Sequence, residues 1–502
     1  MSELLLGIDI GTSSSKGVLA TAAGEVLATA ERPHELSLPR PGHAEHDAET
    51  VWWADFASIC RELLERAPTP PAALCVSGIG PCLLAADAGG RPLRPAILYG
   101  IDTRATAEIE ELTARYGEEA IAARGGSRLT TQAVGPKLLW LQRHEPDVWA
   151  ATERFLMASS FAVLRLTGEY VLDHHSASQC DPLYDLAAGA WAEDWADEIA
   201  PGLPLPRLVW PAEVAGTVTP EAAIATGLPA GTPVAAGTID AWAEAASVGV
   251  DAPGDTMLMY GTTMFIVAVL AQPRTHPALW ATTGVMPGTH CLAGGMATSG
   301  ALTGWLRRIA GDLPYEQLVA EAAAVPAGSA GLVVLPYFAG ERTPIFDPAA
   351  RGTIIGLTLS HGRGHLYRAL LEGTAYGVRH NLEALDDAGG RAQRLVAVGG
   401  GTRGGLWTQI VSDVTGRPQE VPAQTIGAAY GDALLAGMAA GLVDPGAGWN
   451  PIATTVEPDA GAGGLYDELY GVYRELYPAT VAQAHALAAI QQAGPRESVP
   501  SV

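Results

Sequence analysis

The chain has 502 residues, of which 48% are hydrophobic and 17% charged, and its formal net charge is −24. This length predicts two or three domains. The negative charge argues against nucleic acid or an anionic membrane as a partner, because both require a basic face. Five scattered cysteines without a CxxC pair favour reduced packing residues and a cytoplasmic location.

No segment of the chain is expected to enter a membrane. The start "MSELLLGIDIG" lacks the basic region of a signal peptide. The longest apolar stretch, "MLMYGTTMFIVAVLA", is shorter than the ~20 residues of a spanning helix and is interpreted as buried strands.

The opening stretch "LLLGIDIGTSSSKGVLA" predicts a strand, a tight turn and a second strand. Backbone N–H groups in a turn made of Thr12, Ser13 and Ser14 can cradle phosphate oxygens. Asp9, at the carboxyl end of the first strand, could hold Mg²⁺. The alternative is an ordinary surface hairpin with a hydrogen-bonded aspartate. The loop is not a Walker A motif, because GxxxxGK[ST] is absent.

Helices are predicted over 50–66 and 104–116, and strands over 73–77 and 83–86, an alternation typical of α/β layers. In "YGIDTR", Asp102 and Arg104 could hydrogen-bond a polyol, or they could form a solvated ion pair at a helix start.

In "VAAGTIDAWAEAASVG", Asp240 ends a strand and begins a helix. It is either an ordinary N-cap or a general base that accepts a proton from a substrate hydroxyl.

The stretch "TMLMYGTTMFIVAVLA" repeats the opening pattern of strand, Gly-Thr and strand, with Gly261 lying 261 − 11 = 250 residues after Gly11. This echo indicates either chance or two similar halves that join near residues 235–255.

A long helix is predicted over 365–387, and "VAVGGGTRGGLW" follows it with a GxGxxG pattern at residues 399–404. Glu420, about 20 residues on, would complete a dinucleotide-binding fingerprint. A glycine-rich turn before a helix also suits the α-phosphate and base of ATP.

Three further stretches are typical of one family. They are "GTIIGLTLSHGRGHLYRALLEG", with His365 and Glu372, the preceding "LPYFAGERTPIFDPAARG", and "GPKLLWLQRHEP", with Lys137 and Trp140. Over residues 1–485 the chain resembles the FGGY carbohydrate kinases of the actin/hexokinase/heat-shock-chaperone ATPase superfamily.

This resemblance implies an α/β fold of two actin-like (ribonuclease H-like) domains with an ATP and sugar cleft between them. Residues 1–245 would carry the sugar site, the first phosphate loop and the base. Residues 246–485 would bind the nucleotide, and residues 486–502 would form a disordered tail.

The resemblance also implies residue roles. Asp9 matches the metal-linked aspartate and Asp240 the catalytic base. The nucleotide would contact Thr12, Ser13, Ser14, Gly261, Thr262, Gly300, Thr303, Gly400, Gly401 and Arg403. The substrate would contact Gly80, Pro81, Asp102, Arg104 and Asp240. The expected cofactors are ATP and Mg²⁺.

The layout is most similar to that of xylulokinases, so the expected reaction is phosphorylation of a ketopentose such as D-xylulose to the 5-phosphate. "SGIGPC" stands where those kinases usually read Gly-Gln-Met-His, and "YGIDTR" is one residue longer than Trp-Asn-Asp-x-Arg. Ribulose, erythrulose, glycerol or gluconate are therefore alternative substrates.

Rivals from other classes are a non-catalytic nucleotide-gated regulator and an NAD-dependent oxidoreductase. A homodimer is expected from the family resemblance.

Overall fold

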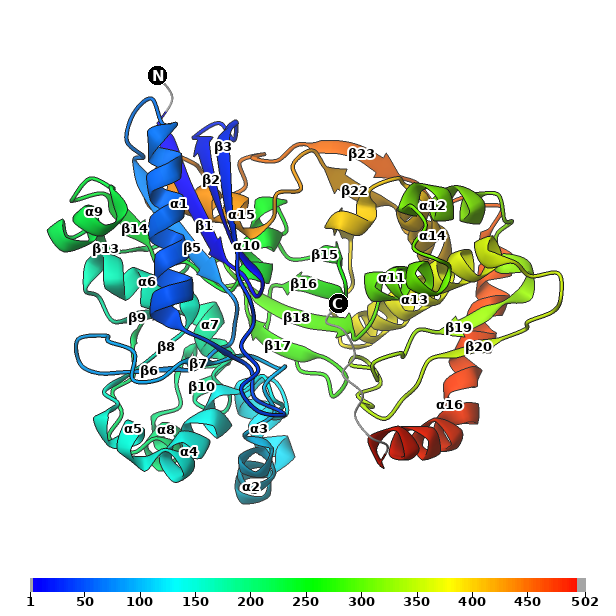
Figure 1. Ribbon diagram of the computed structural model, residues 1–502, viewed down its shortest axis with the longest axis horizontal. Helices are drawn as coiled ribbons and strands as arrows, with labels where there is room; N and C mark the ends of the chain where they lie inside the picture. Colours follow the sequence, from blue (N-terminus) through cyan, green and yellow to red (C-terminus); the bar gives the residue numbers. More distant parts are fainter. Residues whose placement is uncertain (1–2, 494–502) are drawn as a thin grey trace. The chain divides into compact units, whose positions relative to one another are not determined.

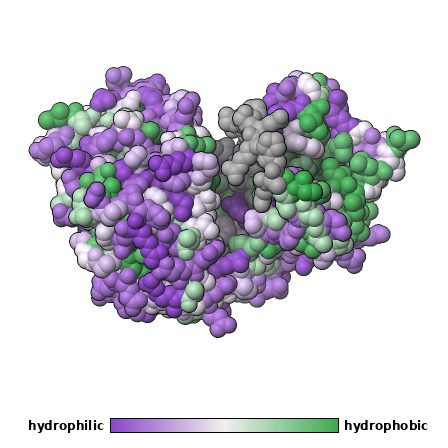
Figure 2. Space-filling model, turned by 60° about the horizontal axis from the view of Figure 1, so that its bottom comes forward, coloured by the Kyte–Doolittle hydropathy of each residue, from purple (hydrophilic) through white to green (hydrophobic). Residues whose placement is uncertain are grey.

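The computed structural model describes residues 3–493, and the chain divides into two compact units. The first unit comprises Met1–Pro253, Val269–Leu292 and Ile426–Pro451. The second comprises Gly254–Ala268, Ala293–Thr425 and Ile452–Val502. Each contains a mixed sheet with helices packed against it (Figure 1). In the face drawn in Figure 2, hydrophilic residues cover most of the left-hand part, whereas hydrophobic residues gather on the right-hand part.

The main sheet of the first unit has six strands in the order β13-β14-β5-β1-β2-β3. Its strands are β1 (Leu4–Ile10), β2 (Ser14–Thr21), β3 (Val26–Pro33), β5 (Ala73–Gly78), β13 (Val214–Thr217) and β14 (Pro233–Ala235). The shorter strands of the unit are β4 (Glu45–His46), β6 (Leu84–Ala86), β7 (Ala96–Ile97), β8 (Arg154–Leu156), β9 (Val171–Asp173), β10 (Tyr184–Asp185), β11 (Ala190–Trp191), β12 (Arg207–Val209) and β17 (Trp280–Thr283).

The helices of the first unit are the π-helical turn η1 (Ala48–Trp53), α1 (Ala54–Glu65), α2 (Thr106–Tyr116), α3 (Glu118–Gly125), α4 (Val134–His144), α5 (Pro146–Ala151), α6 (Ala158–Thr167), α7 (His174–Ser178), α8 (Glu193–Ile199), α9 (Pro220–Thr226), α10 (Asp240–Ser247) and α15 (Ala428–Ala439).

Parallel pairing makes β1, β5 and β14 end at one edge of this sheet. β5 runs parallel to both β1 and β14, so these three strands end at the same edge. An isolated parallel bridge between Gly78 and Ile239 extends the alignment to the residue before α10. In open sheets, ligands bind at the carboxyl ends of such strands.

Helix α15 comes from far along the chain and packs on β1 and α10. The contact requires glycine on both sides. A Cβ on Gly7 would lie 2.0 Å from the Ala429 carbonyl oxygen, and one on Gly431 would lie 1.8 Å from that of Ala243. Backbones that meet this closely fix the position of α15 against the sheet.

The strands of the second unit are β15 (Asp255–Tyr260), β19 (Val333–Leu335), β20 (Thr353–Ile355), β21 (Arg394–Val398), β22 (Gln419–Pro422) and β23 (Ile452–Val456). β16 (Met264–Leu270) and β18 (His290–Met296) each continue into the first unit along the chain. The helices are α11 (Gly300–Ile309), α12 (Tyr315–Ala323), η2 (Ser329–Gly331), α13 (Arg363–Asp387), η3 (Gly400–Thr402), α14 (Leu406–Thr415) and α16 (Gly463–Ala493).

The predicted internal repeat is present in the topology. β1 and β2 form an antiparallel hairpin and β1 pairs in parallel with β5. β15 and β16 likewise form an antiparallel hairpin, and β15 pairs in parallel with β21. In the alignment of Gly11 with Gly261, Asp9 corresponds to Met259, so the second hairpin lacks the carboxylate of the first.

Four expectations from the sequence, on the cysteines, membrane helices, the domain boundary and the C-terminal tail, can be compared with the structure. All five cysteines are free and buried, as predicted. Among residues 3–493, no helix combines the length and the apolar character needed to cross a bilayer. The expected boundary at 245/246 falls inside α10, and segments 269–292 and 426–451 group with the first unit. Residues 486–493 belong to α16 rather than to the expected disordered tail 486–502, of which 494–502 lie outside the described residues.

Candidate functional site

The first phosphate loop, Gly11–Ser13, connects β1 to β2. Gly11 N–H donates to the Ser14 carbonyl at 3.1 Å, and the Ser13 carbonyl accepts from His34 N–H at 2.9 Å. Within residues 3–493, the backbone N–H groups of Thr12 and Ser13 donate to no protein acceptor. Two adjacent unused N–H groups in an accessible turn form a cradle for an anion.

Asp9 lies at the end of β1, in register with Lys16 on β2 and Ser77 on β5. Ser77 Oγ is 3.4 Å from Asp9 Oδ1 and donates a 2.6 Å hydrogen bond to Asp432 Oδ2. The pKa of Asp9 is raised well above its ordinary value, mainly by burial and to a smaller extent by the charges of Asp240 and Asp432. The charge of Lys16 acts in the opposite direction. Asp9 is therefore one of several carboxyl groups crowded at the ends of these strands.

Asp240 is the first residue of α10, and Ile239 is the N-cap, so Asp240 is not the ordinary N-cap that was the alternative interpretation. Its Oδ1 accepts from Ala241 N–H at 2.7 Å, and burial raises the pKa of Asp240 to about 6. A carboxyl group with a pKa this close to neutrality can exchange a proton with a substrate hydroxyl.

Two acidic residues of the same cluster were not singled out from the sequence. Glu244 lies one turn after Asp240 on α10, and burial followed by the charge of Asp240 raises the pKa of Glu244 to about 7. Asp432, on α15, is fully buried, and burial raises its pKa well above the ordinary value. The i, i+4 spacing of Asp240 and Glu244 was the available signal for Glu244; nothing local marks Asp432.

A magnesium ion fits this cluster. The carboxyl groups of Asp9, Asp240 and Asp432 are excess negative charge that a divalent cation would neutralise. Among the described residues, no three His, Cys, Asp or Glu side chains are arranged to hold a metal ion by themselves. Mg²⁺ typically binds through one or two carboxylates while keeping water and phosphate ligands, so a complete protein cage is not required.

Gly80 and Pro81 lie in the segment that follows β5, beside the residue that precedes Asp240. A Cβ on Gly80 would stand 2.6 Å from Ile239 Cγ1, so glycine is required for this approach. Pro81 and Cys82 are buried. The segment thus brings apolar or small groups close to the proposed base, which agrees with the loss of polar side chains noted in the sequence.

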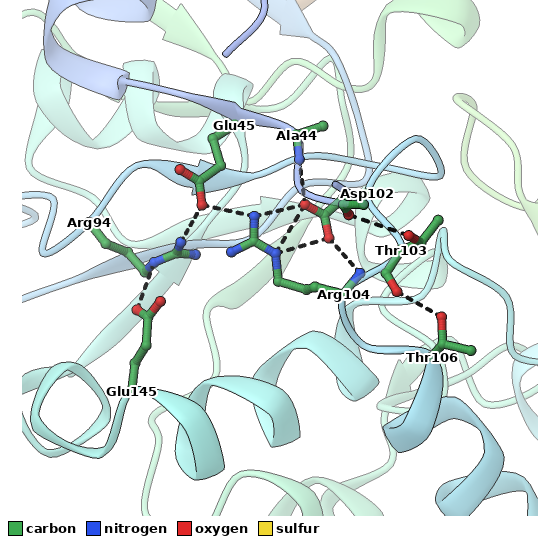
Figure 3. A network of polar contacts seen from close by, with 9 residues as sticks. Ala44, Glu45, Arg94, Asp102, Thr103, Arg104, Thr106 and Glu145 are labelled. Carbon is green, nitrogen blue, oxygen red and sulfur yellow. Dashed lines mark hydrogen bonds and ion pairs between the residues drawn. The ribbon is translucent and has the colours of Figure 1, made fainter. Parts of the chain in front are cut away.

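Asp102 and Arg104 form a buried ion pair rather than a solvated one (Figure 3). Asp102 Oδ2 accepts from Ala44 N–H at 2.7 Å, and Arg104 Nη2 bridges Asp102 and Glu45, at 2.8 Å to each. Arg94 extends the network to Glu145 (Figure 3). The Asp102 carboxylate is thus occupied in holding the loop, whereas Arg104 Nη1 is buried without an acceptor among the described residues.

Trp140, from the "GPKLLWLQRHEP" stretch, supports this network. Its ring lies 5.0 Å from the Arg104 guanidinium carbon, a cation–π distance. Lys137 on the same helix is buried, and burial lowers the pKa of its amine to about 8. Lys137 Nζ donates to the Gln132 carbonyl at 3.3 Å, and the Gln132 side chain accepts from Gly100 N–H at 3.2 Å. The stretch therefore positions the Asp102 loop.

The second unit brings its predicted nucleotide residues together around the Gly261 loop. The carbonyls of Gly261 and Thr262 accept from the first N–H groups of α11, at 3.0 Å from Gly300 and 3.1 Å from Ala301. A Cβ on Gly300 would lie 2.5 Å from the Gly261 carbonyl oxygen. Thr303 Oγ donates to the Gly300 carbonyl at 2.7 Å.

The glycine-rich turn after β21 packs on the same hairpin. A Cβ on Gly399 would lie 2.7 Å from the Tyr260 carbonyl oxygen, and one on Gly401 would lie 2.8 Å from Tyr260 Cβ. Gly400 has open space around it, and Arg403 is exposed before α14. Glu420, which a dinucleotide fingerprint would place on a ribose, instead pairs with Arg394 at 2.6 Å.

Comparison with known proteins identifies the family of this chain. The N-terminal domain model of the FGGY family of carbohydrate kinases matches residues 4–249, and the C-terminal domain model matches residues 256–440. The chain belongs to the FGGY family of carbohydrate kinases. It is a carbohydrate kinase of the two-domain α/β fold, as the sequence predicted, and kinases of this family use ATP as the phosphoryl donor.

Individual relatives cover nearly the whole chain. A xylulose kinase of Escherichia coli (strain K12) is 31% identical over 94% of this chain and 98% of its own. A glycerol kinase of Nocardia farcinica is 32% identical over 89% of this chain and 93% of its own. The crystal structure of a xylulose kinase from Rhodospirillum rubrum matches with a TM-score of 0.88 and 36% identity, covering 96% of this chain and all of that one.

Proposed function

We propose that this kinase transfers the γ-phosphoryl group of ATP to a hydroxyl of D-xylulose, giving the 5-phosphate. The observation that carries the proposal is Asp240, a partly buried carboxyl group with a raised pKa in the cluster that also contains Asp9. The similarity to xylulose kinases supports the sugar.

The chain's own residues supply binding and proton chemistry. Asp240 accepts the proton of the attacking hydroxyl. The unused N–H groups of Thr12 and Ser13 bind phosphate oxygens. Thr262, Gly300 and the Gly400–Gly401 turn line the nucleotide site of the second unit. Arg104 Nη1 donates to a sugar hydroxyl.

Mg²⁺, held through Asp9, would neutralise charge on the transferred phosphate. The protein would act in the cytoplasm as a homodimer that binds neither nucleic acid nor membrane.

The decisive experiment is an ATP-consumption screen over ketoses, aldoses and polyols of about three to seven carbons. We expect ATP turnover to depend on added sugar and to be fastest with D-xylulose, with the phosphate on the C5 hydroxyl by NMR of the product. Turnover that is equally fast without any sugar would contradict a sugar kinase.

Glycerol is the second candidate, favoured by the apolar segment Ile79–Cys82 and by the similarity to a glycerol kinase. A substrate with fewer hydroxyl groups requires fewer polar partners, and each unpaired buried partner costs about 1–3 kcal/mol. A kcat/KM for glycerol above that for D-xylulose would show that glycerol, and not the ketose, is the preferred substrate.

The role of Asp240 is tested by Asp240→Asn. An amide cannot accept the hydroxyl proton, so we expect kcat to fall by about 10²–10⁴-fold. Affinity for ATP, measured by calorimetry, should stay within a few-fold of wild type. Glu198→Gln, an exposed change that leaves the acidic cluster intact, is the control. Retained turnover in Asp240→Asn would show that another group is the base.

A further inference from the structure

His34, directly after β3, lies against the first phosphate loop with only 7% of its side chain exposed. Its Nε2 is 3.1 Å from the Gly11 carbonyl oxygen, and its backbone N–H donates to the Ser13 carbonyl at 2.9 Å. One residue therefore contacts the carbonyl at each end of the loop. Its Nδ1 is 2.8 Å from Asp55 Oδ2, on α1.

The partners of His34 fix the protonation of its ring. The Gly11 carbonyl can only accept a hydrogen bond. Asp55 Oδ2 also accepts from Ser15 Oγ at 2.9 Å, as expected of a carboxylate. A neutral imidazole has one N–H donor and cannot satisfy two acceptors, whereas the imidazolium has two. The geometry thus requires N–H on both ring nitrogens of His34.

The neighbouring histidine has the opposite state. His46 Nδ1 accepts from the Trp52 indole N–H at 3.1 Å, so this ring is neutral. The two imidazoles meet edge to face, with their centroids 5.0 Å apart. The pKa of His46 is lowered to about 4, mainly by burial and to a smaller extent by the charge of His34. His34, by contrast, lies between two acceptors, the Gly11 carbonyl and Asp55.

We propose that His34 is a positioning residue of this kinase, which locks the first phosphate loop as a doubly protonated ring paired with Asp55. The inference rests on the proposed role of this loop in binding the phosphates of ATP. By occupying the carbonyls of Gly11 and Ser13, His34 leaves the N–H groups of Thr12 and Ser13 aligned for phosphate oxygens. A loop without this clamp loses that alignment and binds ATP more weakly.

The kinetic test uses His34→Gln. A glutamine amide can donate to the Gly11 carbonyl, but its own carbonyl would then face the Asp55 carboxylate. We expect the KM for ATP to rise about tenfold, the cost of one lost charge-assisted hydrogen bond, with the KM for the sugar within about twofold of wild type. His485→Gln, a change of an exposed histidine on α16, should leave both constants unchanged.

The rescue variant separates positioning from loss of structure. In His34→Gln/Asp55→Asn, the amide nitrogen introduced on α1 takes the place of Asp55 Oδ2, which contacts both His34 and Ser15. One of its N–H groups can donate to the carbonyl of the introduced glutamine and the other to Ser15 Oγ, because a hydroxyl oxygen can also accept. We expect the KM for ATP to return to within about threefold of wild type. A double variant that is worse than His34→Gln would overturn the proposal.

The protonation state is tested directly on wild-type protein with ¹⁵N-labelled histidine. At about pH 6, two ring N–H protons protected from exchange should appear for one histidine and vanish in His34→Gln, because both are hydrogen-bonded. A single such proton would contradict the doubly protonated ring. Absence of sugar-dependent turnover in wild type would instead reject the proposed function, so the two failures are distinct.

Discussion

Three aspartates that the sequence singles out differ in what surrounds their carboxyl groups. Asp102 is occupied by Ala44 and Arg104. Asp9 shares Ser77 with Asp432. Among the described residues, Asp240 accepts from Ala241 N–H alone, so lone pairs remain for a proton. A general base requires an available lone pair and a pKa near the working pH, and Asp240 meets both conditions.

The raised pKa of Asp240 predicts how the reaction depends on pH. Its pKa is about 6, and the base must be ionised to accept the hydroxyl proton. We therefore expect kcat/KM for the sugar to rise about tenfold per pH unit below about pH 6 and to level off above it. Initial rates at saturating ATP across this range test it. A profile that stays flat from about pH 5 to pH 7 would count against Asp240 as the base.

Tyr99 links two functional segments of the first unit. Its hydroxyl lies 3.0 Å from Thr12 Oγ in the phosphate loop, and the neighbouring Gly100 is held by Thr131 and Gln132. The link therefore depends on this chain's own "YGIDTR" sequence.

Removing the Tyr99 hydroxyl tests this link. In Tyr99→Phe we expect kcat to fall about two- to tenfold, since one neutral hydrogen bond is lost. In Tyr99→Phe/Thr12→Val the loss should not exceed that of the worse single variant, because both remove the same bond. Tyr116→Phe, which removes an exposed bond to Glu198, is the control. Fully additive effects would show that the two hydroxyl groups act independently.

At the scale of elements, α11 offers a matched pair of glycines. Gly300 touches the second phosphate loop, where an added Cβ would lie 2.5 Å from the Gly261 carbonyl oxygen. Gly304, one turn on, has room, since the nearest atom to an added Cβ is Tyr315 Oη at 3.5 Å. The same substitution at the two positions therefore differs mainly in its effect on the loop.

We expect Gly300→Ala to raise the KM for ATP about tenfold or more, because the start of α11 must move away from the loop. Gly304→Ala should leave the KM for ATP unchanged and stabilise the protein by about 0.5–1 kcal/mol, because alanine favours the helix over glycine. Steady-state kinetics and thermal unfolding distinguish the two. Equal KM values for both variants would show that the close contact has no bearing on ATP.

The family signature that includes Glu372 acts on structure rather than on the substrate. The Glu372 carboxylate is buried and accepts from Gly328 N–H at 2.9 Å, Ser329 Oγ at 2.7 Å and Arg368 Nε at 2.8 Å. His365 caps α13, since its Nδ1 accepts from Gly362 N–H at 3.1 Å. The signature thus fixes the start and the packing of one long helix.

Across the whole molecule, local patterns predicted the two hairpins and the helices that follow Asp240 and the glycine-rich turn, because each depends on neighbours in sequence. Contacts between distant segments could not be predicted. Asp432 meets Ser77, 355 residues away, only because α15 packs on β1. No local pattern marks His34 either, since its partners Gly11 and Asp55 lie on separate elements.

Buried titratable groups in both units also predict how the stability of the molecule depends on pH. Burial raises the pKa of Asp173 and Asp240 to about 6, of Glu244 to about 7 and of Glu341 to about 8. Such acids hold more protons when folded than when unfolded, so their contribution to stability falls as pH rises from the unfolded pKa to the folded one. Buried histidines act oppositely. Burial lowers the pKa of His175 to about 3 and of His380 to about 4, so folding is penalised once pH drops below about 6.5.

From about pH 8 down to pH 6.5, the free energy of unfolding should increase by up to about 1.4 kcal/mol per pH unit for each acid that titrates in that range. Denaturant unfolding at closely spaced pH values measures this slope. Glu341→Gln removes one titration while keeping an acceptor for Ala297 and Arg342 N–H, each 2.7 Å from Glu341 Oε1. The slope above about pH 7 should therefore be shallower in Glu341→Gln than in wild type, and an unchanged slope would show that Glu341 does not hold its proton there.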